Sequence, residues 1–543
     1  MAASPSLAGE VDGGTIYRRQ CARCHGAFGE GTTEFPRALA GERTPPQLAK
    51  LIAKTMPEDD PGTCVGPDSD KVAAFIHETF YSKTARERNK PPRVELSRLT
   101  VAQYRNAVAD LIGGFRSGGQ WDSNHGLKAQ YYKNRQFRDN DRVLERVDPQ
   151  VGFDFGEAAP VADKIEPHEF SIRWEGSVLA PETGEYEFII RTEHAARLWL
   201  NNPGKPLIDA WVKSGNDTEY KATLFLIAGR AYPLKLEFSK AKQGVDDSKK
   251  TKIKPKPVKA SMALEWKVPH LPAERIPERY LSTARLAPVF VVTTPFPPDD
   301  RSIGYERGTT ISKAWDQATT EGAIETASYV LSKLNDLADT TTSAKDRPEK
   351  LKAFVAKFVE RAFRRPLNDE DRKRHVTRHF EVSKDPEAAV KRAVLLALKS
   401  PKFLYQEPSE GDAYALASRL SFALWDSSPD DTLRKAAESG KLTNRDELRR
   451  EAERMVVDLR SKAKVRRFLL NWLRVDPVPD PSKDAKLFPG FDAKLAADLR
   501  TSLDLFLDEV VWGDKSDFRI LLQDDSVYLN GRLGKWSQNH GAM

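Results

Sequence analysis

The 543-residue chain is poor in cysteine and has no long apolar run. Three cysteines, Cys21, Cys24 and Cys64, are too few for a disulfide framework. No apolar stretch approaches the roughly 18 residues of a membrane-spanning helix, so no transmembrane segment is expected. The net charge of +7 is a mild excess for this length and does not indicate nucleic-acid binding. Glycine (32) and proline (35) are at ordinary levels, which excludes collagen-like and wholly disordered chains.

Two of the three cysteines lie in one pentapeptide, Cys21-Ala22-Arg23-Cys24-His25. Cys-x-x-Cys-His is the attachment pattern of c-type haem. Two thiols within one helical turn can add to the two vinyl groups of the porphyrin, and the histidine that follows then faces the iron as its proximal ligand. The sequence therefore predicts one covalent haem c held by Cys21, Cys24 and His25.

The residues around the pentapeptide favour a small helical domain. A short helix over 13–20 leads into the cysteines, and the glycines between 26 and 31 permit the tight backbone that ends it. Apolar residues at helical spacing predict further helices over 46–54 and 70–81.

The stretch from about 13 to 82 resembles a small class I cytochrome c. This resemblance implies Met56 as the distal thioether ligand of the iron, and Pro36 is placed like the family proline whose carbonyl holds the proximal imidazole. Ligation by His25 and Met56 would fill both axial positions and favour electron transfer over oxygen activation.

Other interpretations of these residues remain open. A structural zinc site of the Cys₃His type would use Cys21, Cys24, Cys64 and His77. That alternative leaves His25 and the Met56-Pro57 pair without a role. Met56 is also compatible with simple core packing, since methionine fills gaps well. The role of Cys64 is open.

Covalent haem attachment normally takes place outside the cytoplasm, so the cytochrome resemblance implies a periplasmic or extracellular protein. The first residues, 1–5, show neither the basic n-region nor the apolar h-region of an export signal. We therefore expect that signal to be missing from this sequence.

From about residue 120 the apolar residues recur at every second position, which predicts half-buried strands. The clearest runs are 185–190, 197–201 and 234–238, and Gly- and Pro-containing turns separate them. Short, regularly spaced strands of this kind indicate an all-β sandwich or barrel.

Residues from about 126 to 266 resemble the protective-antigen module of adhesins, glycosidases and toxins, which implies a β-sandwich. The matching blocks are 126–132, 151–156, 170–176, 184–188, 197–201 and 264–266. Sugar-binding members hold calcium with a consecutive Asp-Asp pair, but Glu193-His194 stands at that place. Because calcium prefers hard oxygen ligands, bound calcium is not expected. Calcium-independent binding of polysaccharide or protein and a purely structural sandwich both remain open.

Residues 239–259 are rich in lysine. Such a run suits contact with an anionic polysaccharide or nucleic acid, but also a solvated hairpin loop stiffened by Pro255 and Pro257. We favour the loop and expect no nucleic-acid partner, because no aromatic residues interleave with the lysines to stack on bases.

Beyond residue 272 the pattern becomes helical, with helices expected over 316–337, 351–363, 369–380, 387–400, 412–425 and 492–511. Trp425 and Trp472 are expected in the core. His375 and His379 are spaced like two metal ligands on one helix, but the surrounding arginines and lysines favour an ordinary surface helix.

Several blocks resemble a family of large exported cytochrome proteins abundant in planctomycete-type bacteria, which join a cytochrome c head, often a protective-antigen module, and helical domains of unknown function. The blocks are 96–100, 304–308, 312–316, 361–367, 400–405 and 419–425. The family usually continues past the end of this sequence, so a truncated C-terminus is expected.

The sequence thus predicts a multidomain protein with an all-α cytochrome c domain, an all-β sandwich and an all-α helical C-terminal region. The expected boundaries are a tail over 1–12, the haem domain over 13–86, a helical segment over 87–118, the sandwich over 119–270, and helical domains over 271–408 and 409–543. The helix before residue 113 is expected to pack with those after 276, with the sandwich as an insertion.

The expected function is that of an exported cytochrome that passes single electrons to or from a redox partner protein. One alternative is a polysaccharide-binding or scaffold protein in which haem is a sensor or accessory. A second is a haem-dependent oxidoreductase on glycans, so enzymatic activity is uncertain and no catalytic residues are identified.

Overall fold

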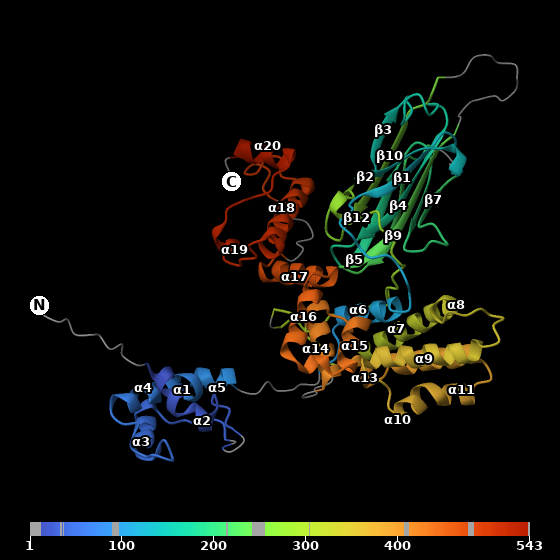
Figure 1. The fold of residues 1–543 in the computed structure, drawn as a ribbon. Helices are drawn as coiled ribbons and strands as arrows, with labels where there is room; N and C mark the ends of the chain where they lie inside the picture. Colours follow the sequence, from blue (N-terminus) through green and yellow to red (C-terminus); the bar gives the residue numbers. More distant parts are fainter. Residues whose placement is uncertain are drawn as a thin grey trace, which may run out of the picture. The chain divides into compact units, whose positions relative to one another are not determined.

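The computed structural model describes residues 12–32, 35, 37–89, 97–212, 216–241, 256–302, 304–406, 412–475 and 483–540. The chain divides into two compact units, Met1–Glu95 and Leu96–Met543. Figure 1 shows the small first unit in dark blue and the elements of the second from light blue to red.

The first unit is helical, as the sequence predicts. Its helices are α1 Gly13–Gln20, α2 Ala22–His25, α3 Pro45–Thr55, α4 Pro67–Ile76, the π-helical turn η1 His77–Tyr81 and α5 Lys83–Asn89. Asp12 begins α1 by accepting the backbone N–H of Thr15 at 2.9 Å. The helix expected over 70–81 is α4 followed directly by the π-helical turn.

The core of this unit forms where α1 packs on α4 and α3 on α4. Tyr17 is 1% exposed, and its ring lies 5.4 Å from that of Phe75 and 5.7 Å from that of Phe80. Gly13 lets α1 approach α4 closely, since a Cβ there would lie 2.2 Å from the carbonyl oxygen of Lys71. Three short helices are thereby fixed around one small apolar centre.

The second unit contains an antiparallel β-sandwich. Its strands are β1 Leu127–Tyr132, β2 Arg142–Asp148, β3 Gly152–Gly156, β4 Phe170–Leu179, β5 Gly184–Arg191, β6 Ala195–Leu200, β7 Ile208–Ala210, β8 Glu219–Leu226, β9 Ala231–Lys240, β10 Ala260–Lys267, β11 Glu274–Arg275 and β12 Leu281–Ser282. Within the described residues one sheet has the order β2-β1-β4-β9-β6-β7, with β12 on β4. The other has the order β11-β10-β5-β8, with β3 on β10. The strands β11 and β12 lie beyond residue 270.

The faces that the two sheets turn toward each other bury the alternating apolar residues, as predicted for β6 and β9. Trp174 and Trp266 are fully buried between them. Asp148, which is 2% exposed, accepts hydrogen bonds from Trp174 Nε1 at 2.8 Å and from the Tyr131 hydroxyl at 2.6 Å. These bonds satisfy the polar ends of large aromatic residues inside the core.

The remaining elements of the second unit are helices. They are α6 Val101–Gly113, α7 Lys313–Ser332, α8 Leu334–Leu337, α9 Arg347–Phe363, α10 Asp369–Arg372, the π-helical turn η4 Lys373–Thr377, α11 Arg378–Val382, α12 Pro386–Leu398, α13 Pro401–Leu404, α14 Ala413–Trp425, α15 Asp431–Glu438, α16 Arg445–Val456, α17 Leu459–Trp472, α18 Ala493–Trp512, α19 Ile520–Gln523 and α20 Gly531–His540. Thr100 and Gln103 form a capping box at the start of α6.

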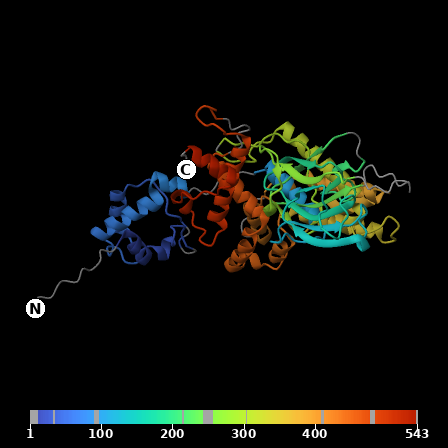
Figure 2. The same cartoon turned by 90° about the horizontal axis from the view of Figure 1, so that it is seen from above.

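Helix α6 shares one hydrophobic core with helices that follow the sandwich. Tyr104 and Val108 of α6 lie in the same cluster as Val355 of α9 and Val394 of α12. Figure 1 shows α6, in blue, next to α7, and in the view from above in Figure 2 the strands of the sandwich overlie these helices. The sandwich is therefore an insertion between α6 and the rest of the helical fold.

Three expectations from the sequence are wrong: the burial of Trp472, the exposure of His375 and the single helix over 316–337. Trp425 is 1% exposed as expected, but Trp472 is 48% exposed, because it ends α17 and its ring packs on Phe518, which is itself 55% exposed. His375 does not lie on the surface but is 5% exposed, with its ring 4.9 Å from that of Phe363. The helix expected over 316–337 breaks at Lys333 into α7 and α8.

Most of the lysine-rich segment lies outside the described residues. Lys240, its first lysine, does not belong to a solvated loop. It is fully buried at the end of β9, donates a hydrogen bond to the carbonyl oxygen of Val258 at 2.6 Å, and has a pKa lowered by burial.

Candidate functional site

The predicted haem ligands lie at the junction of α1 and α2. Cys21 ends α1 and directly precedes α2. Its carbonyl oxygen accepts the backbone N–H groups of Cys24 at 3.2 Å and of His25 at 3.0 Å. The two cysteines and the histidine therefore occupy one hydrogen-bonded helical turn, which is the spacing that attachment to two vinyl groups needs.

The loop after the histidine folds back over this turn. The His25 carbonyl oxygen accepts the backbone N–H of Gly31 at 2.8 Å, and Thr32 donates its hydroxyl to the Cys24 carbonyl oxygen at 3.2 Å. Gly29 has φ +75°, and a Cβ there would lie 2.7 Å from the ring of Phe80. Glycine is required at this position because both the backbone angle and the aromatic contact exclude a side chain.

The protonation states of the ligands suit a metal porphyrin. Burial raises the pKa of Cys21 to about 11, with smaller contributions from Cys64 and Cys24, so the sulfur is a thiol at neutral pH. Burial also lowers the pKa of His25, which favours the neutral imidazole that binds metals. Both cysteines of the pentapeptide are free thiols. The donor set therefore fits a haem c.

Met56, the predicted distal ligand, ends α3 and packs half-buried against the same apolar cluster as Cys21. Cys64 also lies in this cluster, at 1% exposure. The structure thus brings Met56 and Cys21 to one core. Pro36, predicted to hold the proximal imidazole, lies outside the described residues.

The zinc alternative has no support in the geometry. Its four candidate ligands, Cys21, Cys24, Cys64 and His77, all belong to the described part of the chain. Within that part no group of three or more histidine, cysteine, aspartate or glutamate side chains is placed to hold a metal ion. The same finding leaves His375 and His379 without a third ligand.

In the sandwich, Glu193 and His194 replace the acidic pair of sugar-binding relatives and are engaged in internal contacts. The Glu193 carboxylate accepts the backbone N–H and the hydroxyl of Ser261, each at 2.8 Å. His194 is 3% exposed, with Nε2 at 2.9 Å from the Lys259 carbonyl oxygen. These side chains fix the start of β10 against the turn between β5 and β6.

We expect calcium to leave this protein unchanged. Adding Ca²⁺ should shift the thermal unfolding midpoint no more than the same concentration of Mg²⁺, because the Glu193 carboxylate is already bonded to Ser261. Differential scanning calorimetry with and without a chelator measures this. A stabilisation specific to Ca²⁺ that disappears in Glu193→Gln would contradict the expectation.

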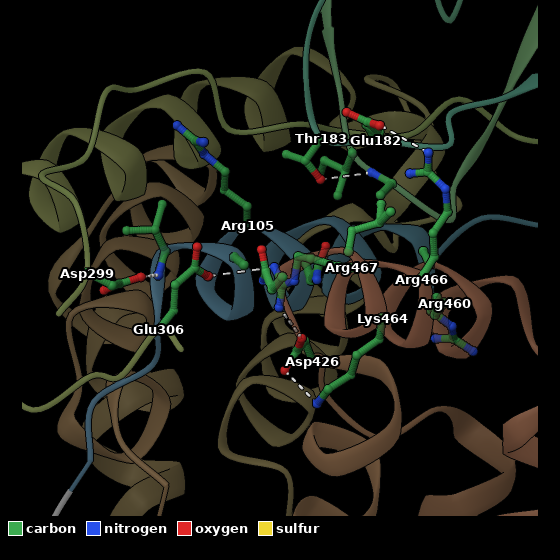
Figure 3. A pocket seen from close by; sticks show the side chains of 18 of the residues that line it. Arg105, Glu182, Thr183, Asp299, Glu306, Asp426, Arg460, Lys464, Arg466 and Arg467 are labelled. Carbon is green, nitrogen blue, oxygen red and sulfur yellow. Dashed lines mark hydrogen bonds and ion pairs between the residues drawn. The ribbon is translucent and has the colours of Figure 1, made fainter. Parts of the chain in front are cut away.

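A cleft of about 450 Å³ lies where the sandwich meets the helices. Figure 3 shows side chains of the turn between β4 and β5 facing those of α6 and α17 across it. Its charged lining residues are Arg105, Glu182, Arg230, Asp299, Arg301, Glu306, Asp426, Arg460, Lys464, Arg466, Arg467 and Arg500. Sequence analysis did not predict this cleft, although the alternation of basic residues over 460–467 was a visible signal.

Ion pairs across the cleft join the sandwich to the helices. Arg466 of α17 bonds Glu182 of the sandwich at 3.1 Å and Asp504 of α18 at 2.7 Å. Lys464 and Arg467 both pair with Asp426, at 2.9 and 2.8 Å (Figure 3). Because these cations are already paired with carboxylates, the cleft is primarily a charged interface between the sandwich and the helices of the second unit.

Comparison with family models assigns separate segments of the chain. Residues 10–76 match "Cytochrome C oxidase, cbb3-type, subunit III", and residues 123–278 match "PA14 domain". Residues 350–407 and 412–537 match two proteins of unknown function, DUF1595 and DUF1592. The chain therefore combines a helical cytochrome c domain with a PA14 β-sandwich, the protective-antigen type predicted from the sequence, and two helical domains of unknown function.

Among curated proteins, anti-sigma-I factor RsgI3 of Acetivibrio thermocellus is 37% identical over 113 residues. The match covers 21% of this chain and only 17% of that relative. A solved anti-sigma factor domain-containing protein from Clostridium clariflavum is 25% identical, with 32% of this chain and 52% of that chain covered and a TM-score of 0.25. The chain thus spans about half of that solved chain.

Two further solved structures each match about a third of this chain. The epithelial adhesin 6 A domain of Candida glabrata, in complex with Galb1-3GlcNAc, is 11% identical and covers 32% of this chain and 92% of its own, with a TM-score of 0.24. The PA14 sugar-binding domain from an RTX adhesin is 12% identical and covers 30% and 99%, with a TM-score of 0.23. Among the described helices, none is both long and apolar enough to cross a membrane.

Proposed function

We propose that this protein is an exported c-type cytochrome that transfers single electrons to or from a redox partner protein. The observation that carries the proposal is the helical turn that presents Cys21, Cys24 and His25 together, within a segment matching a cytochrome c family. Because covalent haem attachment takes place outside the cytoplasm, the proposal includes a periplasmic or extracellular location. It also includes membership of the exported planctomycete-type cytochromes that the sequence resembles.

In this proposal four residues of the first unit hold the haem. Cys21 and Cys24 would tether the porphyrin, and His25 and Met56 would be ligands of its iron. When bound, the haem supplies a one-electron redox couple. Cys21 and Met56 pack against the apolar core of α1, α3 and α4, and this environment would help to set the potential.

An absorption spectrum of protein matured in the periplasm tests this proposal. Sharp reduced α and β bands that survive extraction with acidified acetone support a thioether-linked haem. A colourless protein, or bands lost on extraction, would contradict it.

Replacing Met56 with alanine should weaken the low-spin spectrum expected for His/Met ligation and lower the reduction potential, because a thioether ligand raises the potential. The spectrum and a redox titration of Met56→Ala measure both effects. Ile52→Val, which removes one methylene from the same cluster, is the matched control and should leave the spectrum intact. An unchanged spectrum in Met56→Ala would remove this residue from the site.

We further propose that the PA14 sandwich binds polysaccharide or protein without calcium, which makes a binding or scaffold role the second candidate function. The match to the PA14 family supports binding, and the internal bonding of Glu193 and His194 supports independence from calcium. A glycan array probed with and without chelator tests both parts. Binding that requires Ca²⁺ would overturn the second part, and no binding to any glycan would leave protein ligands as the alternative.

A further inference from the structure

A second, smaller pocket of about 240 Å³ lies inside the helical part of the second unit. It is formed by the end of α6, by α9 and by the segment that leads into α15 (Figure 1). Gly114, Arg361 and Ser428 line it together with carboxylates of Asp110, Asp430 and Asp431. Neither the haem proposal nor the family matches give this pocket a role.

Arg361 is a buried cation with donors to spare. Its side chain is 6% exposed, and its Nη2 donates to both oxygens of Asp431, at 3.1 and 2.9 Å. The guanidinium also lies 4.3 Å from the ring centre of Phe115. Its Nε and Nη1 atoms are buried and have no hydrogen-bond partner among the described residues. Such unmet donors are costly, so they point to a missing acceptor.

A further polar group and a glycine lie beside this arginine. Ser428 is 7% exposed, and its hydroxyl likewise has no partner within the described part of the chain. Gly114 has no side chain, and a Cβ there would lie 2.8 Å from Arg361 Nη1. Gly114 therefore lies directly against the guanidinium group, and a side chain there would press on Arg361.

The charges around the pocket are balanced. Asp431 pairs with Arg361 and Arg434, Asp110 with Arg230 and Arg460, and Asp430 with Arg454. Arg460 pairs in addition with Asp458, and Arg454 with Glu451. An anion would therefore be held by the unmet donors of Arg361 and Ser428, without a local excess of positive charge.

We propose that this pocket binds a small oxyanion, a carboxylate or phosphate group, through Arg361 and Ser428. Arginine is well suited to such groups because its hydrogen bonds to them are charge-assisted. The volume lies below the 300–1,000 Å³ that is usual for sites of drug-sized ligands, which indicates a small anion or the charged end of a larger molecule.

The test uses the full chain and two probes, inorganic phosphate and acetate, titrated at constant ionic strength with chloride as the balancing anion. Gly114→Ala is the main variant. Its backbone is right-handed helical, so alanine brings no backbone strain, while the new Cβ presses on Arg361 Nη1. Gly113→Ala is the matched control: it adds the same methyl group at a neighbouring residue of the pocket, but its Cβ meets nothing within 4 Å. Ser428→Ala removes the second unpaired donor group and leaves the Arg361–Asp431 pair in place.

We expect wild type and Gly113→Ala to bind one of the probes at a single site in calorimetry, with phosphate or acetate preference identifying the oxyanion. Gly114→Ala and Ser428→Ala should each weaken that binding by about tenfold or more, as expected for loss of a hydrogen bond to a charged group. No saturable binding of either probe to wild type, or equal binding in all variants, would overturn the proposal. Water would then be the hydrogen-bond partner of the Nε and Nη1 donors of Arg361.

Discussion

Replacing both thiols of the pentapeptide, Cys21→Ala with Cys24→Ala, is expected to abolish covalent haem attachment completely. Each thioether needs one of these sulfurs, and the helical turn supplies no substitute. Intact mass spectrometry of protein matured in the periplasm should show the mass of one haem on the wild type and none on the double variant.

Cys64→Ala is the matched control for this experiment. Cys64 is buried in the same cluster as Cys21, so its replacement perturbs the same core without touching the attachment turn. We expect Cys64→Ala to keep the full haem mass. A wild-type protein with no added mass, or a Cys64→Ala variant that loses a bound metal, would contradict the haem site and revive a metal site made of thiolates.

Asp110→Asn is expected to destabilise the second unit by about 3–5 kcal/mol, the usual cost of leaving buried partners without their countercharge. The Asp110 carboxylate bonds Arg230 at 2.9 Å, Arg460 at 3.1 Å and the hydroxyl of Ser427 at 2.7 Å. Arg460 in turn lies 3.5 Å from the ring centre of Trp425. One carboxylate thereby connects α6, the sandwich and α17. Unfolding in denaturant measures how much it contributes to the free energy of unfolding.

The same carboxylate should make stability depend on pH. Burial alone would raise the pKa of Asp110, but Arg230, Arg460 and Ser427 outweigh it and hold the pKa below its ordinary value of 3.8. Because the carboxyl is more acidic in the folded state, its stabilisation is present above that ordinary value and is lost as the pH falls through the lowered pKa. Wild type should therefore lose more stability than Asp110→Asn over this acidic range.

Glu453→Gln is the control for the charge change, since its pair with Arg449 is exposed at 62% and 79% of the two side chains. Exposed pairs contribute about 0–1 kcal/mol, so this variant should remain close to wild type at every pH. If Asp110→Asn costs no more than Glu453→Gln, the buried network does not hold the sandwich to the helices.

The sequence by itself determined the features that local chemistry governs. Five consecutive residues predicted the haem site, because covalent attachment requires both thiols and the imidazole within one turn. Period-two alternation predicted the strands β6 and β9 with their buried faces. Each of these signals depends only on neighbours a few positions apart.

Only the tertiary structure decided which surfaces meet. Asp110 and Arg460 are 350 positions apart, and no local pattern marks them as partners. Trp472 and His375 were misjudged for the same reason, since helical spacing gives a helix its faces but not the neighbours that cover them. Likewise, the small pocket forms because the distant segments that carry Gly114, Arg361 and Ser428 pack together. The unpaired donors of Arg361 and Ser428 are therefore visible only in the assembled fold.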